Sequence, residues 1–268
     1  MALIKVKIPK MGMTTEDVAK FFETYYAPNN AVLTLVGDFD RGKALSLIRK
    51  YFGKIPRRPD PPRVDLTEPA QQGERRDTIT DPLARLPHMF VVFKTTRGNT
   101  PDQYALEVLS SILQGGDSSR LYQKLNKERE LVAGIGGYAD ERIGTGTLTI
   151  SATIRPGRKI EDVEAAIYEE IERLKKEPVA AWEMQKAKNA MRLNYYSGIR
   201  GTQSRATRLG SYTVKFDDPS LINTRIEKLN AVTAQDVQRV AQRYLNQDNR
   251  TVLITMPATA SSPAPAAN

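Results

Sequence analysis

A single histidine, His88, decides which metal chemistry this chain could carry out. The chain contains no cysteine, so thiolate metal sites and disulfides are excluded. Zinc sites are built from cysteine, histidine and carboxylate ligands, and one histidine with carboxylates alone would suit magnesium or calcium better. His88 stands at the start of an apolar segment, where we expect a polar edge group of a strand. We therefore predict no metal ligand and no catalytic residue, and the sequence identifies no substrate-binding residue.

Two other groups of residues could be interpreted as sites. Gly-Gly-Asp-Ser-Ser at residues 115–119 could cradle a phosphate at a helix N-terminus. It lacks the P-loop Lys-Ser/Thr and the G-x-G-x-x-G pattern, and it follows a helical segment, so we interpret it as a tight turn between helices. A run of carboxylates could serve acid–base chemistry, but no apolar pocket is visible around it, which is typical of a solvated surface. These carboxylates are Glu128, Glu130, Asp140 and Glu141.

The basic residues outnumber the acidic ones by 40 to 31, which gives a net charge of +9. Such a balance can indicate a nucleic-acid partner. Here the basic residues are mixed with acidic ones and are not interleaved with aromatics, so we do not expect nucleic-acid binding. Positive charge is concentrated over two successive predicted helices, where it could attract acidic peptide segments. The residues concerned are Lys186, Lys188, Arg192, Arg200, Arg205 and Arg208.

The elements that must position these residues follow from the spacing of apolar side chains. Period-two or continuous apolar runs predict strands at 31–36, 86–96, 133–141, 146–154 and 250–256. Apolar residues at helical spacing predict helices at 14–26, 38–52, 101–113, 119–129, 159–176, 179–197, 203–214, 220–229 and 234–245. The segment at 31–36 is apolar except for Thr34, so we expect a buried strand there.

Proline marks the main boundary, because four prolines fall between Pro56 and Pro62. This predicts an extended linker over 54–73, which separates an N-terminal piece (1–53) from a larger unit (74–257). An Ala/Pro/Ser-rich end (258–268) is predicted to be disordered. No run approaches the roughly 20 apolar residues that span a bilayer, and no signal peptide is visible. We expect a cytoplasmic protein by default, and a periplasmic one if the true N-terminus is missing.

An internal repeat connects the two ends of the chain. Thr-Thr-Glu-Asp-Val at residues 14–18 leads through Tyr-Ala-Pro-Asn-Asn to an apolar segment, and Thr-Ala-Gln-Asp-Val at 233–237 leads through Asn-Gln-Asp-Asn to another. The second copy follows a whole unit, whereas only 13 residues precede the first. The sequence therefore predicts one complete repeat preceded by the last part of another.

These segments resemble the insulinase-type (pitrilysin-like) zinc metallopeptidases. Tyr-Tyr-Ala-Pro-Asn-Asn-Ala-Val-Leu-Thr-Leu at 25–35 resembles the end of the family's first domain, and Leu-Gln-Gly-Gly-Asp-Ser-Ser-Arg-Leu at 113–121 the middle of the second. Ala-Lys-Asn at 187–189 and the closing helix at 233–237 follow in the family's order. The resemblance implies an α+β fold, with a mixed or antiparallel sheet packed by helices, preceded by a remnant of a first such domain.

The resemblance also implies which catalytic parts are missing. The family's zinc is held by an H-x-x-E-H helix of the first domain, which one histidine cannot supply. In members whose second domain takes part in catalysis, an arginine and a tyrosine hold the substrate carbonyl. The matching positions are Asn126 and Ala133, which could not do so. The pattern is similar to the second domain of a zinc-bearing subunit, whose Arg/Tyr pair comes from a partner chain.

The resulting prediction is a non-catalytic C-terminal half that completes a peptide-binding chamber with a zinc-bearing partner. No cofactor is expected in this chain, and zinc is expected only in the partner or in a missing N-terminal domain. Two alternatives remain open: a peptidase subunit active only when a separate chain supplies the zinc domain, and a peptide-binding scaffold. Expected partners are unfolded polypeptide and a zinc-bearing or Arg/Tyr-bearing chain, or further copies. Because the strand at 31–36 would lack neighbours, we expect residues 13–52 to dock on the main unit or to promote oligomers.

Overall fold

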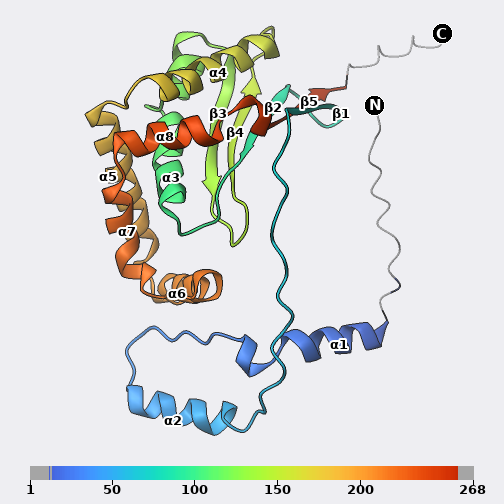
Figure 1. Cartoon of the computed structure of the whole chain (residues 1–268), viewed down its shortest axis with the longest axis vertical. Helices are drawn as coiled ribbons and strands as arrows, with labels where there is room; N and C mark the ends of the chain where they lie inside the picture. The colour runs from blue at the N-terminus through green and yellow to red at the C-terminus, as the bar shows by residue number, and fades with distance from the viewer. Residues whose placement is uncertain (1–11, 13, 259–268) are drawn as a thin grey trace, which may run out of the picture.

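The computed structural model describes residues 12 and 14–258. Its centre is a mixed five-stranded sheet with the strand order β1-β5-β2-β4-β3 (Figure 1). The first pair, β1 and β5, is parallel, and the remaining pairs are antiparallel. The predicted α+β fold is thus confirmed. The strands are β1 (Arg75–Asp81), β2 (His88–Lys94), β3 (Val132–Asp140), β4 (Thr147–Ile154) and β5 (Arg250–Pro257).

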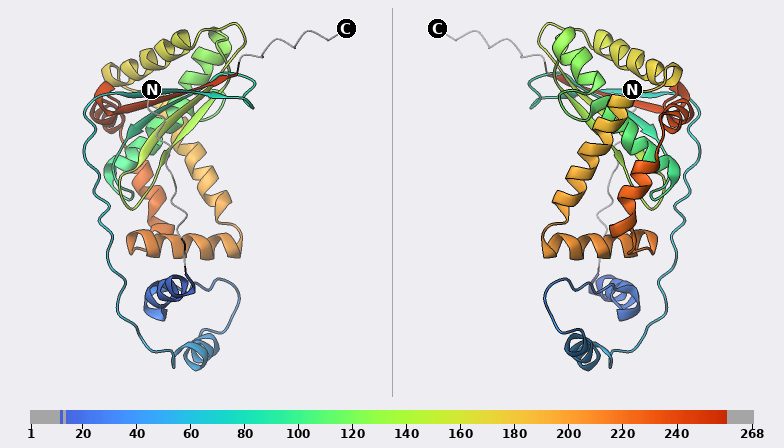
Figure 2. Two further views of the ribbon diagram at one scale, coloured as in Figure 1. Left: turned by 90° about the vertical axis from the view of Figure 1, so that its right-hand side faces the viewer. Right: turned by 90° about the vertical axis from the view of Figure 1, so that its left-hand side faces the viewer.

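Helices cover one face of this sheet and extend beyond it (Figures 1 and 2). Helices α3, α4 and α8 contribute most of their buried residues to one core with the strands. Helices α5, α6 and α7 lead away from the sheet toward the N-terminal piece. The bounds are α3 (Pro101–Gln114), α4 (Ile160–Lys176), α5 (Ala181–Gly198), α6 (Thr202–Phe216), α7 (Leu221–Ala231) and α8 (Ala234–Tyr244).

Strict alternation along β4 explains why the sheet has one helix-covered face. Leu148, Ile150 and Ile154 are fully buried against the helices, and the threonines and serine between them are only half-buried. Burying each such aliphatic side chain contributes about 1.5–3 kcal/mol, and a shift of one residue would turn the hydroxyls inward. The pattern therefore fixes the register of β4 between β2 and β3.

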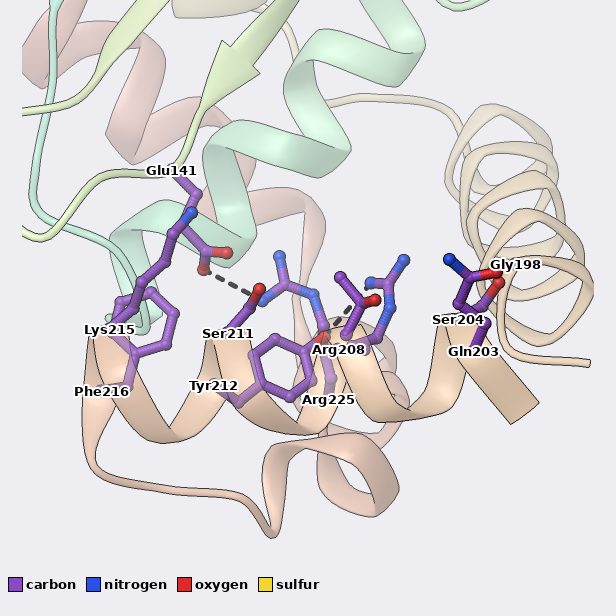
Figure 3. Close-up of a pocket in the computed structure, with 11 residues that line it drawn as sticks. Glu141, Gly198, Gln203, Ser204, Arg208, Ser211, Tyr212, Lys215, Phe216 and Arg225 are labelled. Atoms are coloured by element: carbon purple, nitrogen blue, oxygen red, sulfur yellow. Dashed lines mark hydrogen bonds and ion pairs between the residues drawn. The ribbon is translucent and has the colours of Figure 1, made fainter. Parts of the chain in front are cut away.

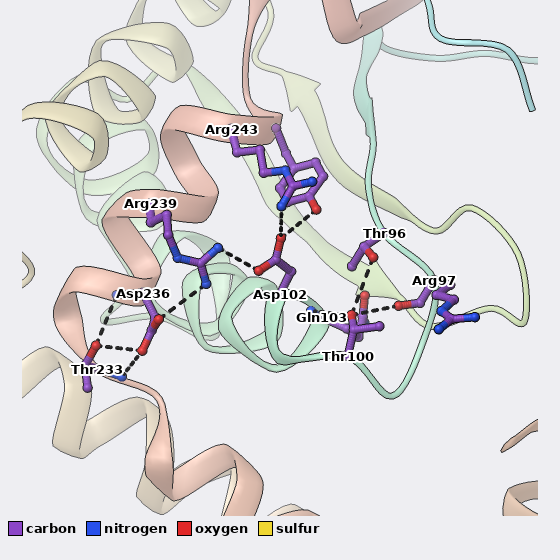
Figure 4. A network of polar contacts seen from close by, with 10 residues as sticks. Thr96, Arg97, Thr100, Asp102, Gln103, Thr233, Asp236, Arg239 and Arg243 are labelled. Carbon is purple, nitrogen blue, oxygen red and sulfur yellow. Dashed lines mark hydrogen bonds and ion pairs between the residues drawn. The ribbon is translucent and has the colours of Figure 1, made fainter.

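A polar network joins α8 to the start of α3 (Figure 4). Asp102 accepts hydrogen bonds from Arg239 at 2.7 Å, Arg243 at 2.9 Å and the Tyr244 hydroxyl at 2.7 Å. At the other end of α8, Thr233 and Asp236 form a capping box, which satisfies free N–H groups of the first turn. Both copies of the Thr-x-x-Asp repeat cap a helix in this way, because Thr14 and Asp17 do the same for α1 (Thr15–Tyr25).

The N-terminal piece lies apart from the sheet and buries little of its apolar surface (Figures 1 and 2). It contains α1, the short helix η1 (Pro28–Asn30) and α2 (Arg41–Phe52), and no residue of these helices is buried. The predicted buried strand at 31–36 is wrong, since the segment has no strand pairing and Leu33 is 59% exposed. Its apolar pattern suits a sheet, but the described residues offer it no neighbouring strand. One polar contact reaches the main unit, from Thr34 Oγ1 to the Ala206 carbonyl at 3.0 Å.

Two further elements differ from the sequence-based expectation. Strand β1 was not predicted, because its side chains are almost all exposed and polar, and only its pairing with β5 defines it. The helix expected at 119–129 is largely the π-helix η2 (Tyr122–Glu128). Residues 56–72 contain no helix or strand. Most of the predicted disordered end (258–268) lies outside the described residues.

The helices that the structure describes include none with the length and hydrophobicity of a membrane span.

Candidate functional site

His88 lies on the central strand β2, on the sheet face that the helices leave open. Its Nδ1 is 3.0 Å from Thr153 Oγ1 and its Nε2 is 2.9 Å from Ser151 Oγ, so both ring nitrogens are engaged with hydroxyls of β4. Burial lowers the pKa of His88, which favours the neutral ring. His88 begins a strand, as the sequence predicts. The prediction that it is an edge group is wrong, because β2 is the middle strand of the sheet.

The Gly-Gly-Asp-Ser-Ser segment forms the expected turn between α3 and η2. A Cβ atom on Gly115 would lie 2.4 Å from the Ser111 carbonyl oxygen, and Gly116 has a φ of +78°, so both positions require glycine. The Ser119 amide and hydroxyl both donate to the Gly116 carbonyl. This segment therefore turns the chain.

Asn126 and Ala133 stand on either side of the connection from η2 to β3. Asn126 Nδ2 donates to the Val132 carbonyl at 3.0 Å, so its amide stabilises this connection. Ala133 lies in an irregularity of the strand pairing, and its side chain is exposed. An alanine methyl offers no hydrogen-bond donor. The structure thus gives Asn126 a local structural contact and leaves Ala133 at an open strand edge.

That open edge belongs to β3, the last strand on one side of the sheet. Within the part of the chain that the structure describes, it pairs only with β4, which leaves the backbone N–H and C=O groups on its other side without a strand partner there. The strand contains Gly134, Gly136 and Gly137, and its largest side chain, Tyr138, is 59% exposed. Few side chains therefore obstruct an extended peptide that would add itself as a further strand.

Glu141 does not lie on a solvated surface, which corrects one of the four carboxylate predictions. It accepts from Arg225 Nη1 at 2.9 Å, and the same guanidinium contacts Glu107 through Nη2 at 2.5 Å. Burial and the nearby Glu141 raise the pKa of Glu107, although Arg225 opposes this. Nothing in the sequence indicated this cluster, because its members come from α3, the end of β3 and α7. Glu128 and Glu130 are exposed as predicted.

The basic residues of α5 and α6 do not form one charged surface. Lys186 Nζ donates to the Ser118 carbonyl at 2.6 Å, and Lys188 Nζ donates to the carbonyls of Asn230 and Val232. These lysines therefore hold helix ends and turns. The positive charge expected over these two helices is therefore divided among separate contacts, and of the six residues Arg208 is the one that lines the cavity described next.

The cavity around Arg208 has a volume of about 480 Å³ and lies between α5, α6, α7 and the loop after β3 (Figure 3). One face of α6 forms most of its lining, and Glu141 and Arg225 close it on the sheet side. The lining is mainly polar. We call it the α6 pocket, and its residues are Glu141, Gly198, Gln203, Ser204, Thr207, Arg208, Ser211, Tyr212, Lys215, Phe216 and Arg225.

Comparison with known proteins places this architecture in a family. The sequence matches the model of the peptidase M16 inactive domain over residues 12–191. The chain belongs to this family. The zinc protease PqqE of Helicobacter pylori is 26% identical over 246 residues, which cover 91% of this chain and 55% of that protein. An uncharacterized zinc protease of Mycobacterium tuberculosis is also 26% identical, and the match covers 88% of this chain and 54% of that protein. The chain thus spans about half the length of the curated relatives it matches.

Solved structures agree on the M16 fold. A protease from Helicobacter pylori superimposes with a TM-score of 0.83 at 24% identity and covers 92% of this chain and 60% of that one. A peptidase M16 inactive domain from Pseudomonas fluorescens gives a TM-score of 0.76 at 20% identity, with 94% and 60% covered. The resemblance inferred from the sequence is therefore confirmed, and the chain is an inactive C-terminal M16 domain of the kind found in zinc-protease-like proteins.

The zinc that the M16 family implies does not fit the side chains of this domain. The nitrogens of His88 already face hydroxyl groups, which are not the nitrogen, thiolate and carboxylate donors that zinc prefers. Among the described residues, no three histidine, cysteine, aspartate or glutamate side chains are grouped as a metal site requires.

Proposed function

We propose that this chain is the non-catalytic half of an M16 peptidase, which completes a peptide-binding chamber with a zinc-bearing half. The zinc and its activated water would belong to that other half, either a separate chain or a domain of the same longer protein. This domain would position peptide and close the chamber. Asn126 and Ala133 support the non-catalytic role, because neither supplies the arginine or tyrosine donor for a substrate carbonyl.

The observation that carries this proposal is the exposed apolar surface of the N-terminal piece. On α1, Phe21 is 51%, Phe22 50% and the adjacent Tyr26 67% exposed. The Phe21 ring contacts that of Tyr25, and the Phe22 ring contacts that of Tyr26, in tilted arrangements. A contiguous aromatic surface of this kind marks an interaction site. Together with the unpaired apolar segment at 31–36, it provides the surface on which a zinc-bearing half would pack.

The open edge of β3 supports the peptide-binding part of the proposal. An unfolded peptide added next to β3 would gain main-chain hydrogen bonds that do not depend on its sequence. A chamber that accepts unfolded polypeptides needs such sequence-tolerant contacts. The exposed, glycine-rich strand leaves room for the varied side chains of the peptide.

Binding to a zinc-bearing half is tested by mixing this chain with the M16 chain of the same genome that carries the H-x-x-E-H motif. We expect a complex on gel filtration, zinc only in the partner, and no cleavage of reduced insulin B chain by this chain alone. Cleavage that appears only on mixing would make the chain a working peptidase subunit. Peptide affinity without turnover in the complex would favour the scaffold alternative. Metal-dependent cleavage by the purified chain alone would overturn the proposal.

Peptide binding at β3 is tested with N-methylated peptides. A peptide added as a strand points every second N–H toward the protein. Methylation of one alternate set should lower affinity about tenfold or more, whereas methylation of the other set, the matched control, should leave it unchanged. Equal effects of both sets would exclude strand addition.

A further inference from the structure

Arg208 occupies an unusual position in the α6 pocket. Its guanidinium lies between two aromatic rings, 5.1 Å from the centroid of Tyr195 and 6.0 Å from that of Tyr212. Its one hydrogen bond to another described residue is long, from Nη1 to the Tyr212 hydroxyl at 3.4 Å. No carboxylate of the described residues lies within ion-pair distance of it. A half-buried guanidinium with five N–H donors is thus left with most of them uncommitted.

Neighbouring arginines show how different this arrangement is. Arg225, on the same pocket wall, has two carboxylate partners, Glu107 and Glu141. Arg205, three residues before Arg208 on α6, donates to the Ile199 carbonyl at 2.8 Å and is exposed. Arg208 alone among these three combines partial burial with free donors that face a cavity (Figure 3).

The surrounding side chains hold Arg208 in place. The Tyr195 hydroxyl donates to the Ile222 carbonyl at 2.8 Å, which anchors its ring between α5 and α7. Tyr212 is the one buried residue of α6. A Cβ atom on Gly198 would lie 3.7 Å from Arg208 Nη2, so the guanidinium lies close to the end of α5. The donor group is therefore positioned before any ligand arrives, which lowers the entropic cost of binding.

We propose that the α6 pocket binds a carboxylate of an acidic peptide, with Arg208 as its main hydrogen-bond donor. A guanidinium matches a carboxylate with two parallel N–H···O bonds. The hydroxyls of Ser204, Thr207 and Ser211 line the same space and offer further donors. That the carboxylate belongs to a peptide rests on the proposed function, whereas the inference that the ligand is a carboxylate rests on the residues of the pocket.

The charge of the lining favours an anion over a cation. Glu141 is the one carboxylate among the lining residues, and it pairs with Arg225, which it shares with Glu107 outside the lining. Arg208 and Lys215 then leave excess positive charge in a partly enclosed space, where charge–charge attraction is stronger than in bulk water. A volume of about 480 Å³ lies in the range of pockets that hold small organic ligands, and it exceeds what a single inorganic anion fills.

The experiment distinguishes binding of a carboxylate group from binding of a peptide that carries it. Amide chemical shifts of α6 are followed during titration with N-acetyl-glutamate, inorganic phosphate, and an extended peptide with a central Glu-Glu pair or its Gln-Gln counterpart. Variants are R208Q, R208K and, as matched control, R205Q. We expect saturable shifts with N-acetyl-glutamate and the acidic peptide, an affinity loss of about tenfold or more in R208Q, partial retention in R208K, and no change in R205Q.

Each remaining outcome has a definite meaning. Loss of N-acetyl-glutamate binding in R205Q equal to that in R208Q, or no saturable shift with any carboxylate, would overturn the α6 site. Phosphate that binds while both carboxylate probes fail would also overturn it. Binding of N-acetyl-glutamate without binding of either peptide would support the carboxylate site but contradict the peptide chamber of the proposed function. If R208Q fails to fold, as judged by its thermal transition, R208K carries the comparison.

Discussion

Arg120 and Glu183 form a bidentate ion pair that links the segment after α3 to the first turn of α5. Arg120 Nε and Nη2 donate to the two carboxylate oxygens of Glu183, each at 2.7 Å. Glu183 Oε2 also accepts from the Ala180 amide at 3.1 Å. Burial opposes ionisation of Glu183, but these hydrogen bonds and the charge of Arg120 hold its pKa below the usual value. A carboxylate of α5 thus fixes the Ser-Ser-Arg-Leu segment, which is one of the segments that resemble the family.

Removal of this arginine should destabilise the domain strongly. R120A leaves the largely buried Glu183 without its countercharge, and we expect the free energy of unfolding to fall by about 3 kcal/mol. The control is R129A, because Arg129 and Glu169 form an exposed pair, whose loss should cost far less stability because water screens it. Urea denaturation at pH 7 measures both values. Equal losses in the two variants would contradict the structural role of the Arg120–Glu183 pair.

The Asp102 network predicts stability that is lost in acid. Burial opposes ionisation of Asp102, but Tyr244, Arg239 and Arg243 lower its pKa overall. A lowered pKa contributes stability that is present above the ordinary aspartate value, near pH 4, and is lost as the pH falls through the lowered value. We expect D102N to be less stable than the wild type by about 1–3 kcal/mol at pH 7, with the difference shrinking below pH 4. Unfolding curves from pH 2 to pH 7, with D117N as the exposed control, would show it, and a pH-independent difference would speak against it.

The sequence predicted most regular elements but not the contacts that make sites. Alternation along β4 identified a strand correctly, because one-sided burial leaves a clear pattern. The same reasoning failed at 31–36, because an apolar run predicts a strand only where other strands are available. Strand β1 left no pattern, since backbone pairing alone defines it. The α6 pocket brings together Glu141, Gly198 and Arg225, residues far apart in sequence, and only the packing of α5, α6 and α7 could show that they meet.

Glu107 should show the opposite pH dependence to Asp102. Its pKa is raised because it is buried and close to Glu141, with Arg225 compensating in part. A raised pKa contributes stability that is present below the ordinary glutamate value, near pH 4.3, and is lost as the pH rises through the raised value. We therefore expect E107Q, which keeps the shape of the side chain, to gain stability relative to the wild type as the pH rises from 4 to 8. The same urea curves measure this, and a gain that instead grows toward acid would refute the assignment.

The exposed aromatic surface of α1 should make the purified chain self-associate when no partner half is present. The rings of Phe22 and Tyr26 are in tilted contact with centroids 4.4 Å apart, and both remain largely exposed, so association would remove their apolar area from water. Sedimentation equilibrium should show concentration-dependent dimers or larger species. F22D should shift them toward monomer, whereas K20S on the same helix should not. Neither variant should alter the thermal transition of the sheet domain, because no α1 side chain is buried. A monodisperse wild-type monomer, with fast amide exchange over residues 14–52, would exclude α1 as an association surface.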